Sequence, residues 1–238
     1  MGRAFEFRKA RKMKRWSNMS KTFTRIGREI IIAVKESGPD PSSNSRLRAI
    51  IQNAKAANMP KDNIERAIKK ASEKSSENFK EVLLEGYAPH GIAILVEAAT
   101  DNNNRTVANI RSYFNKCDGS LATSGSVDFL FDHLCFFQIK DQGIDIDVLE
   151  LDLIDFGVIE LSKLENEISI TARFEDFGSI QKELERRGLE ISSSEFEREA
   201  KINKILTEDK RLKVERLINM IDEDEDVQNV YHDMKTID

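Results

Sequence analysis

Cations near the N-terminus, in RAFEFRKARKMKRW at residues 3–16, are the side chains of this sequence best suited to bind a charged ligand. On a helix, four of them recur at i, i+3, i+4 and i+7 and form one stripe: Arg8, Arg11, Lys12 and Arg15. Like-charge pairs four residues apart destabilise a helix by about 0.2–0.5 kcal/mol each. Bound phosphates would neutralise this repulsion between like charges, so we expect polyanion binding here. A merely solubilising surface is the alternative.

Charge is distributed unevenly along the chain. Residues 1–80 contain 20 Lys and Arg and 8 Asp and Glu, a net charge of +12. Residues 81–238 contain 17 basic and 34 acidic residues, a net charge of −17, so the overall −5 conceals the contrast. This asymmetry indicates a polyanionic partner for the N-terminal part, which the C-terminal part would repel.

Further cations extend the predicted nucleic-acid-binding set. Beyond the stripe, the candidates are Lys9, Lys14, Lys21, Arg25, Lys55, Lys61, Arg66, Lys69, Lys70 and Arg105. The nearby aromatic residues Phe5, Phe7 and Trp16 could stack on unpaired bases, but packing into a helical bundle is the favoured interpretation. No reader motif is present, so base-specific recognition is not indicated.

The loop TDNNNRT at residues 100–106 has two interpretations. It leads into a predicted helix whose first backbone N–H groups, with Arg105, could bind an anion. The favoured alternative is that its Asn and Asp side chains cap the helix and shape a turn.

Signatures of catalysis or metal binding are missing from the sequence. It contains no GxxxxGK[ST], GxGxxG, GxSxG or HExxH pattern. His133 and Cys135 form an H-x-C pair that could touch a metal, but a strand-edge role is favoured. Cys117 near a predicted helix end and the acids of IDEDEDV at 221–227 are interpreted as structural and solvated. We therefore expect no enzyme activity, no cofactor and no metal.

Composition indicates a soluble, charge-rich globular chain. Its 238 residues include 39% hydrophobic and 33% charged residues, and no apolar run approaches the length of a membrane span. The basic N-terminus lacks a following apolar segment, which argues against a secretory signal. Two cysteines make neither a disulfide framework nor a zinc site. A cytoplasmic protein is expected, with an organelle-targeting peptide as a weaker alternative.

The periodicity predicts helices first and strands later. Three amphipathic helices are expected in the basic part: one capped by Ser20 and stopped by Gly38, one carrying Leu47 to Ala54, and one capped by Asp62 or Asn63. The composition of residues 72–78 predicts a linker. A hairpin of 81–89 and 91–99, a helix at 104–119 and a strand at 126–133 follow.

The elements predicted after residue 134 follow the order of a known fold. Strands and helices alternate as β-α-β-β-α-β over 135–200, the ferredoxin-like pattern, and a final helix at 207–224 and strand at 227–234 complete the preceding sheet. The predicted fold is α+β with three domains. These are a basic helical bundle at 1–78, an α/β domain from 79–134 and 201–238, and a ferredoxin-like α/β domain at 135–200 inserted into it.

One block carries a family resemblance. KAANMPKDNIERAIKKAS at 55–72, supported by 27–51 and 85–131, resembles the signature of the YebC/PmpR family of bacterial regulators and of their mitochondrial relative, the translational activator of cytochrome c oxidase. The resemblance covers essentially the whole chain and implies three domains, with the third inserted into the second. The chain departs from the family pattern before Ser20 and at Ala88–Gly91, where His90 is expected to be exposed.

The resemblance implies a non-enzymatic regulator of gene expression. Members are described as DNA-binding transcriptional regulators and also as translation factors that act on the ribosome and ease synthesis of proline-rich sequences. We expect the first role, with the ribosome and its RNA as the alternative ligand. The sequence of the basic domain shows no evident helix-turn-helix motif, which favours RNA as the ligand. A metal-dependent enzyme and a protein-interaction scaffold built on the acidic domains are weaker alternatives.

Overall fold

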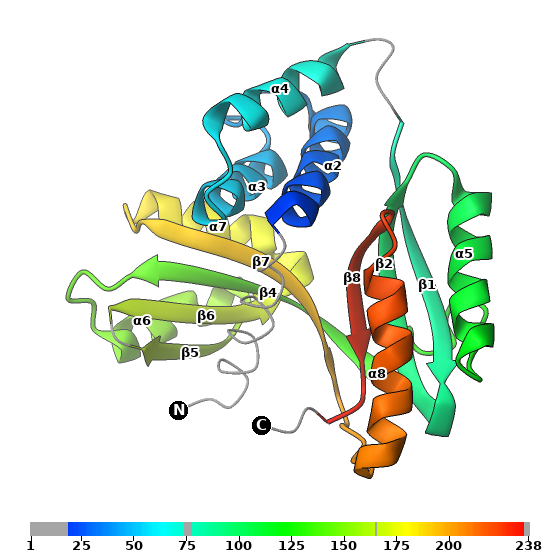
Figure 1. The fold of residues 1–238 in the computed structure, drawn as a ribbon. Coiled ribbons are helices and arrows are strands. Elements are labelled where there is room, and N and C mark those ends of the chain that lie inside the picture. Colours follow the sequence, from blue (N-terminus) through cyan, green and yellow to red (C-terminus); the bar gives the residue numbers. More distant parts are fainter. Residues whose placement is uncertain (1–18, 74–77, 165, 236–238) are drawn as a thin grey trace. The chain divides into compact units, whose positions relative to one another are not determined.

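A computed structural model describes residues 19–73, 78–164 and 166–235. The basic part forms three helices, α2 (Met19–Ser37), α3 (Ser45–Ala56) and α4 (Lys61–Ser72) (Figure 1). Gly38 ends α2 with a φ of 88°, as predicted, and the Asn44 side chain caps α3 by accepting from the Leu47 N–H. The predicted cap of α4 is wrong. Pro60 is the N-cap, in a non-helical conformation with a ψ of 138°, and its side chain has no oxygen that could accept the first N–H groups of the helix.

The second part of the chain builds a four-stranded sheet. Strands β1 (Lys80–Ala88) and β2 (Ile92–Thr100) form the predicted hairpin, and the sheet order is β3-β1-β2-β8 with β3 (Ser120–Leu121) and β8 (Val227–His232) at the edges. Helices α5 (Asn103–Lys116) and α8 (Glu208–Asp222) pack on one face through a core that includes Ile94, Phe114 and Leu217. The C-terminal helix and strand therefore complete this sheet, as the sequence predicts.

The turn of the β1–β2 hairpin lies where the sequence departs from the family pattern. A short 3₁₀ turn, η1 (Pro89–Gly91), joins the two strands, and His90 is exposed. Its φ of 66° lies in the left-handed region that costs an L-residue about 1–2 kcal/mol. Glycine would adopt this conformation without that cost.

The predicted strand at 126–133 is wrong in its first half. Residues Asp128–Leu130 form a 3₁₀ turn, η2, and the strand β4 begins at Phe131 and runs to Lys140. The cause is Glu85 on β1, whose buried carboxylate accepts backbone N–H groups of Gly125 at 2.6 Å, Val127 at 2.6 Å and Asp128 at 2.9 Å. These bonds curl the backbone, so the alternating sequence is not extended there.

The inserted region has the predicted ferredoxin-like arrangement. In chain order it contains β4, α6 (Ile146–Leu153) with the 3₁₀ turn η3 (Ile154–Phe156), β5 (Val158–Leu164), β6 (Glu167–Arg173), the 3₁₀ turn η4 (Phe174–Asp176), α7 (Phe177–Arg186) and β7 (Ile191–Ala200). The sheet order is β5-β6-β4-β7. Both helices contribute to the core, through Leu149 and Leu153 of α6 and Ile180 and Leu184 of α7. The predicted α+β fold class is confirmed.

Contacts divide the chain into two compact units. The first unit lies within residues 1–76 and 133–197, and the second within 77–132 and 198–238. In the first unit, helix α3 contacts the inserted region, since the guanidinium of Arg48 donates to the carboxylate of Glu185 on α7 at 2.8 Å. The three-domain division stays a prediction, because these contacts join the helical part and the inserted part in one unit.

Candidate nucleic-acid interface

The predicted basic stripe lies outside the described residues. Arg8, Lys9, Arg11, Lys12, Lys14 and Arg15 all fall within residues 1–18. Of the remaining candidates, Arg105 lies on α5, and the others lie on α2, α3 and α4.

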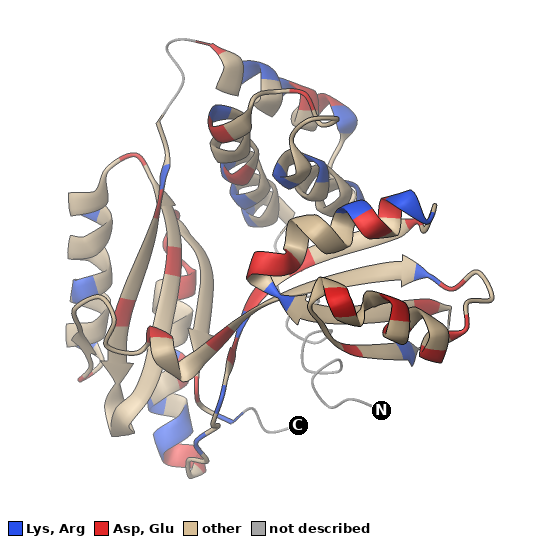
Figure 2. Ribbon diagram, turned by 180° about the vertical axis from the view of Figure 1, so that it is seen from behind, with Lys and Arg blue, Asp and Glu red and all other residues tan. Residues whose placement is uncertain are grey.

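Exposed cations gather at the end of α3 and along α4. Lys and Arg positions along these helices are visible in Figure 2. All five predicted candidates on α3 and α4 are exposed: Lys55, Lys61, Arg66, Lys69 and Lys70. The four on α4 face outward because this helix buries its opposite side, through Ile64 and Ala71. The amphipathic spacing of the sequence thus fixes which side of α4 is basic.

The exposed cations differ in how far they are already neutralised. Lys61 lies 3.4 Å from Glu65, an exposed pair of the kind that contributes little. Arg66 donates to the Asp62 carbonyl and to Asn63 Oδ1. Within 19–73, 78–164 and 166–235, Lys55 and Lys69 form no ion pair, so their charges are available to a ligand.

Other predicted cations serve the interior of the bundle. Arg25 is buried within α2 at 7% exposure, and Lys21 is half-buried at the start of the same helix. Two further cations of this part act structurally. Arg46 pairs with Glu36 at 2.8 Å, and Arg48 donates to the Pro41 carbonyl as well as to Glu185. The accessible basic surface is therefore smaller than the number of cations suggests.

The loop at residues 100–106 follows the capping interpretation. Asn102 Oδ1 accepts the Arg105 N–H at 3.1 Å and caps α5. The Arg105 guanidinium donates to Asp101 at 2.9 Å and to the buried Asp226 at 2.8 Å. These carboxylates, Asp226 first, raise the pKa of Arg105. Its predicted contact with nucleic acid stays a prediction, and its observed partners are carboxylates of the protein.

The sulfur and imidazole groups have structural surroundings. Cys135 is fully buried and its thiol donates to the Arg173 carbonyl at 3.2 Å, while burial, followed by the charge of Asp176, raises the pKa of the thiol to about 12. The His133 ring stacks on Phe174, with ring centroids 3.8 Å apart. Among the residues that the structure describes, no three His, Cys, Asp or Glu side chains gather in a way that could hold a metal ion. None of the helices in this part of the chain is long and apolar enough to cross a membrane.

Family models match both parts of the chain. Residues 3–74 match the TACO1/YebC protein N-terminal domain, and residues 79–234 match the TACO1/YebC second and third domain. The chain belongs to the TACO1/YebC family. The family boundary between 74 and 79 coincides with the predicted linker after α4.

Relatives within the TACO1/YebC family are similar along their whole length. A protein of Flavobacterium johnsoniae is 68% identical over 235 residues, covering 99% of each chain, and one of Porphyromonas gingivalis is 58% identical, covering 99% of this chain and 98% of its own. Both are named "Probable transcriptional regulatory protein". The crystal structure of a conserved hypothetical protein, Aq1575 from Aquifex aeolicus, matches with a TM-score of 0.74 and 36% identity over 91% of this chain and 90% of its own.

The cations predicted on α4 are exposed, but local sequence patterns do not indicate the internal partners of other cations in this part. The ion pair of Arg48 and Glu185 joins positions 137 residues apart, so no local sequence pattern predicts it. The burial of Arg25 follows from its place between the apolar positions of α2, a signal that the hydrophobic periodicity does contain.

Proposed function

We propose that this TACO1/YebC family member is a non-enzymatic regulator of gene expression that binds nucleic acid, with DNA as the primary ligand. The observation that carries the proposal is the exposed basic surface formed by the end of α3 and the outer side of α4, within a part of the chain whose net charge is +12. Exposed Lys and Arg side chains bind phosphates by displacing condensed counterions, which requires no sequence motif.

The charge distribution supports a polyanionic ligand. Lys55 and Lys69 are exposed on α3 and α4 without an ion pair in the described ranges, and the predicted stripe at residues 8–15 adds positive charge to the same part of the sequence. The strongly acidic remainder of the chain repels a polyanion. A nucleic acid would therefore bind the basic helices in preference to the acidic part of the chain.

The connection between α3 and α4 supports DNA as the ligand. Each helix has 12 residues, and only residues 57–60 separate them. Asn58 adopts a φ of 59° in this turn. Helix-turn-helix proteins join two helices by a turn of about this length and read DNA with the second helix. The sequence pattern alone gave no such indication. The names of the relatives, "Probable transcriptional regulatory protein", agree with this assignment.

The environment of the reactive groups supports a binding role over catalysis. A thiol with a pKa of about 12 is a poor nucleophile at neutral pH. The acids near α5 are engaged structurally, since Asp224 Oδ2 accepts the Tyr113 hydroxyl at 2.9 Å and Asp226 Oδ2 accepts the Thr106 hydroxyl at 2.8 Å. A regulator needs only binding and partner contacts.

The test is ultraviolet crosslinking in cells of the full chain and of its Lys55→Glu/Lys69→Glu variant, followed by sequencing of the recovered DNA and RNA. Promoter DNA enriched with the native chain and lost with the variant is the expected result. Enrichment of ribosomal RNA would replace DNA binding by the translation-factor alternative. Equal recovery with both chains would contradict nucleic-acid binding through this surface.

A further inference from the structure

Helix α6 of the inserted region is apolar on two opposite sides. Its inner side packs into the core of the ferredoxin-like sheet through Leu149 and Leu153, which are 4% and 0% exposed. A helix that covers one face of a sheet normally carries polar residues on its other side. Here the other side is partly apolar, and the core does not account for it.

The outer side carries three large aliphatic residues in a row. Val148, Leu151 and Ile154 follow one another at a spacing of three residues and are 54%, 71% and 59% exposed. Val148 and Leu151 lie on α6, and Ile154 begins η3 directly after it with helical dihedral angles. At about 100° per residue, the row is centred on the side opposite Leu149 and Leu153. Single exposed aliphatic residues need no explanation, but a contiguous row marks an interaction surface. We call Val148, Leu151 and Ile154 the outer stripe.

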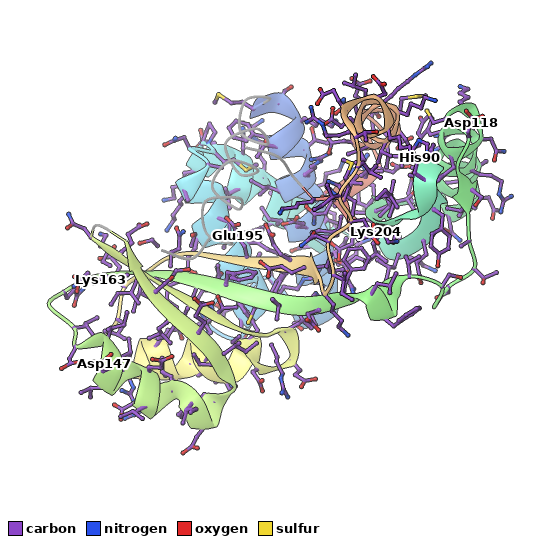
Figure 3. All side chains as sticks on the ribbon, turned by 90° about the horizontal axis from the view of Figure 1, so that it is seen from below. His90, Asp118, Asp147, Lys163, Glu195 and Lys204 are labelled. Atoms are coloured by element: carbon purple, nitrogen blue, oxygen red, sulfur yellow. The ribbon has the colours of Figure 1, made fainter. Side chains whose placement is uncertain are left out.

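The outer stripe is surrounded by negative charge. Residues 141–162 contain seven Asp and Glu and no Lys or Arg. Three of these acids have internal roles: Asp141 pairs with Lys163 at 2.5 Å, Asp145 caps α6, and Asp152 pairs with Arg187 at 2.6 Å. The others are exposed and form no ion pair within the described part of the chain: Asp147, Glu150, Asp155 and Glu160. Figure 3 labels Asp147 on α6.

We propose that the outer stripe docks a basic amphipathic helix of a partner protein. Apolar residues at helical spacing pack into a partner's apolar ridge or groove, and the unpaired acids would meet Lys or Arg side chains that flank it. The same acids oppose other ligands. A second copy of α6 would bring like charges together, and nucleic acid or an anionic membrane would be repelled. This surface is distinct from the basic surface of α3 and α4.

The test uses two synthetic peptides without tryptophan. One is an amphipathic helix with Leu at i, i+3, i+4 and i+7 and Lys at flanking positions, and its control has Glu in place of every Lys. Binding to the full chain is measured by fluorescence anisotropy of the labelled peptide. The basic peptide should bind, and Leu151→Ser/Ile154→Ser should weaken it about tenfold or more. Ile202→Ser/Ile205→Ser alters residues of the other unit with 78% and 73% exposure and should leave binding unchanged.

Four results would overturn the proposal. Equal binding of the basic and acidic peptides, or binding indifferent to the Leu151 and Ile154 substitutions, would remove the stripe as a docking site. A dimer in sedimentation experiments that Leu151→Ser dissociates would assign the surface to a second copy. A shift in the emission of Trp16, the single tryptophan, on Leu151→Ser would assign it to the chain's own N-terminal segment.

Discussion

Asn53 of α3 binds the main chain of Ser194 in β7 with both ends of its side-chain amide. Oδ1 accepts the Ser194 N–H at 3.0 Å, and Nδ2 donates to the Ser194 carbonyl. Strand β7 lies at the edge of its sheet, so this residue would otherwise present an unpaired N–H and C=O. The amide imitates one residue of a neighbouring strand, and Ser194 is only 2% exposed as a result.

Replacing Asn53 should loosen this junction. Asn53→Ala removes both hydrogen bonds from a buried peptide group, which predicts a loss of about 1–3 kcal/mol in local stability. Hydrogen exchange at the Ser194 amide should accelerate correspondingly. Asn104→Ala, at an exposed position of α5, is the matched control. An unchanged exchange rate at the Ser194 amide would show that water replaces the hydrogen bonds of the Asn53 side chain without loss of local stability.

Glu85 should stabilise the loop at 125–128 in a pH-dependent way. Burial alone would raise the pKa of its carboxyl, but backbone N–H groups of Val127, Gly125 and Asp128 outweigh burial and hold the pKa below its ordinary value. The ionised form is therefore favoured by folding. Its contribution is present above the unfolded-state pKa of about 4.3 and is lost as pH falls through the folded-state pKa.

The measurement compares hydrogen exchange of the 125–128 amides in the native chain and in Glu85→Gln. At pH 7 the variant should lose about 1–3 kcal/mol of protection, because an amide NH₂ cannot accept as the carboxylate does. The difference should shrink as the pH falls below about 4. Glu223→Gln, at an exposed helix end, controls for the loss of charge. A difference that is constant with pH would refute the role of ionisation.

Cys135 should be chemically inert in the folded protein. With its pKa raised to about 12 by burial and by Asp176, only about one thiol in ten thousand is ionised at pH 8. A disulfide reagent should modify neither Cys135 nor the buried Cys117 in native conditions, and both in denaturant. Rapid modification of the native protein would contradict the structural role of Cys135.

Elements with strong local signals were predictable from the sequence. The β1–β2 hairpin follows from two apolar runs around Pro89, and the β-α-β-β-α-β order of the inserted region follows from its alternating periodicities. The half-turn at Asp128–Leu130 was not predictable, because the carboxylate that bends it lies on Glu85, some 40 residues earlier in the sequence. A local sequence pattern does not indicate which residues form hydrogen bonds with distant parts of the chain.

The candidate site was predictable in charge and less so in detail. The amphipathic spacing of α4 correctly placed Lys69 and Arg66 outward. The internal partners of Arg105 depend on tertiary packing that composition does not reveal, whereas the burial of Arg25 follows from its place between the apolar positions of α2. Outward positions are thus easier to predict than free charges, because a charge is neutralised by whichever residue folding brings near it.

Reversing the N-terminal stripe should abolish polyanion binding. A chain with Arg8→Glu, Arg11→Glu, Lys12→Glu and Arg15→Glu turns four attractive charges repulsive, so its affinity for duplex DNA should fall below detection. Circular dichroism should remain that of the native chain. Binding at native affinity would eliminate these residues as contacts.

The salt dependence of DNA affinity shows whether the exposed lysines of the helical part contact phosphates. For the native chain, the logarithm of the association constant for a short duplex should fall steeply and linearly with the logarithm of salt concentration. Lys55→Glu/Lys69→Glu should weaken binding and reduce that slope by about one for each lysine, while Lys210→Glu/Lys213→Glu on α8, with the same change in net charge, should leave the slope unchanged. A flat salt response, or equal effects of the two double variants, would contradict nucleic-acid binding by the helical part of the chain.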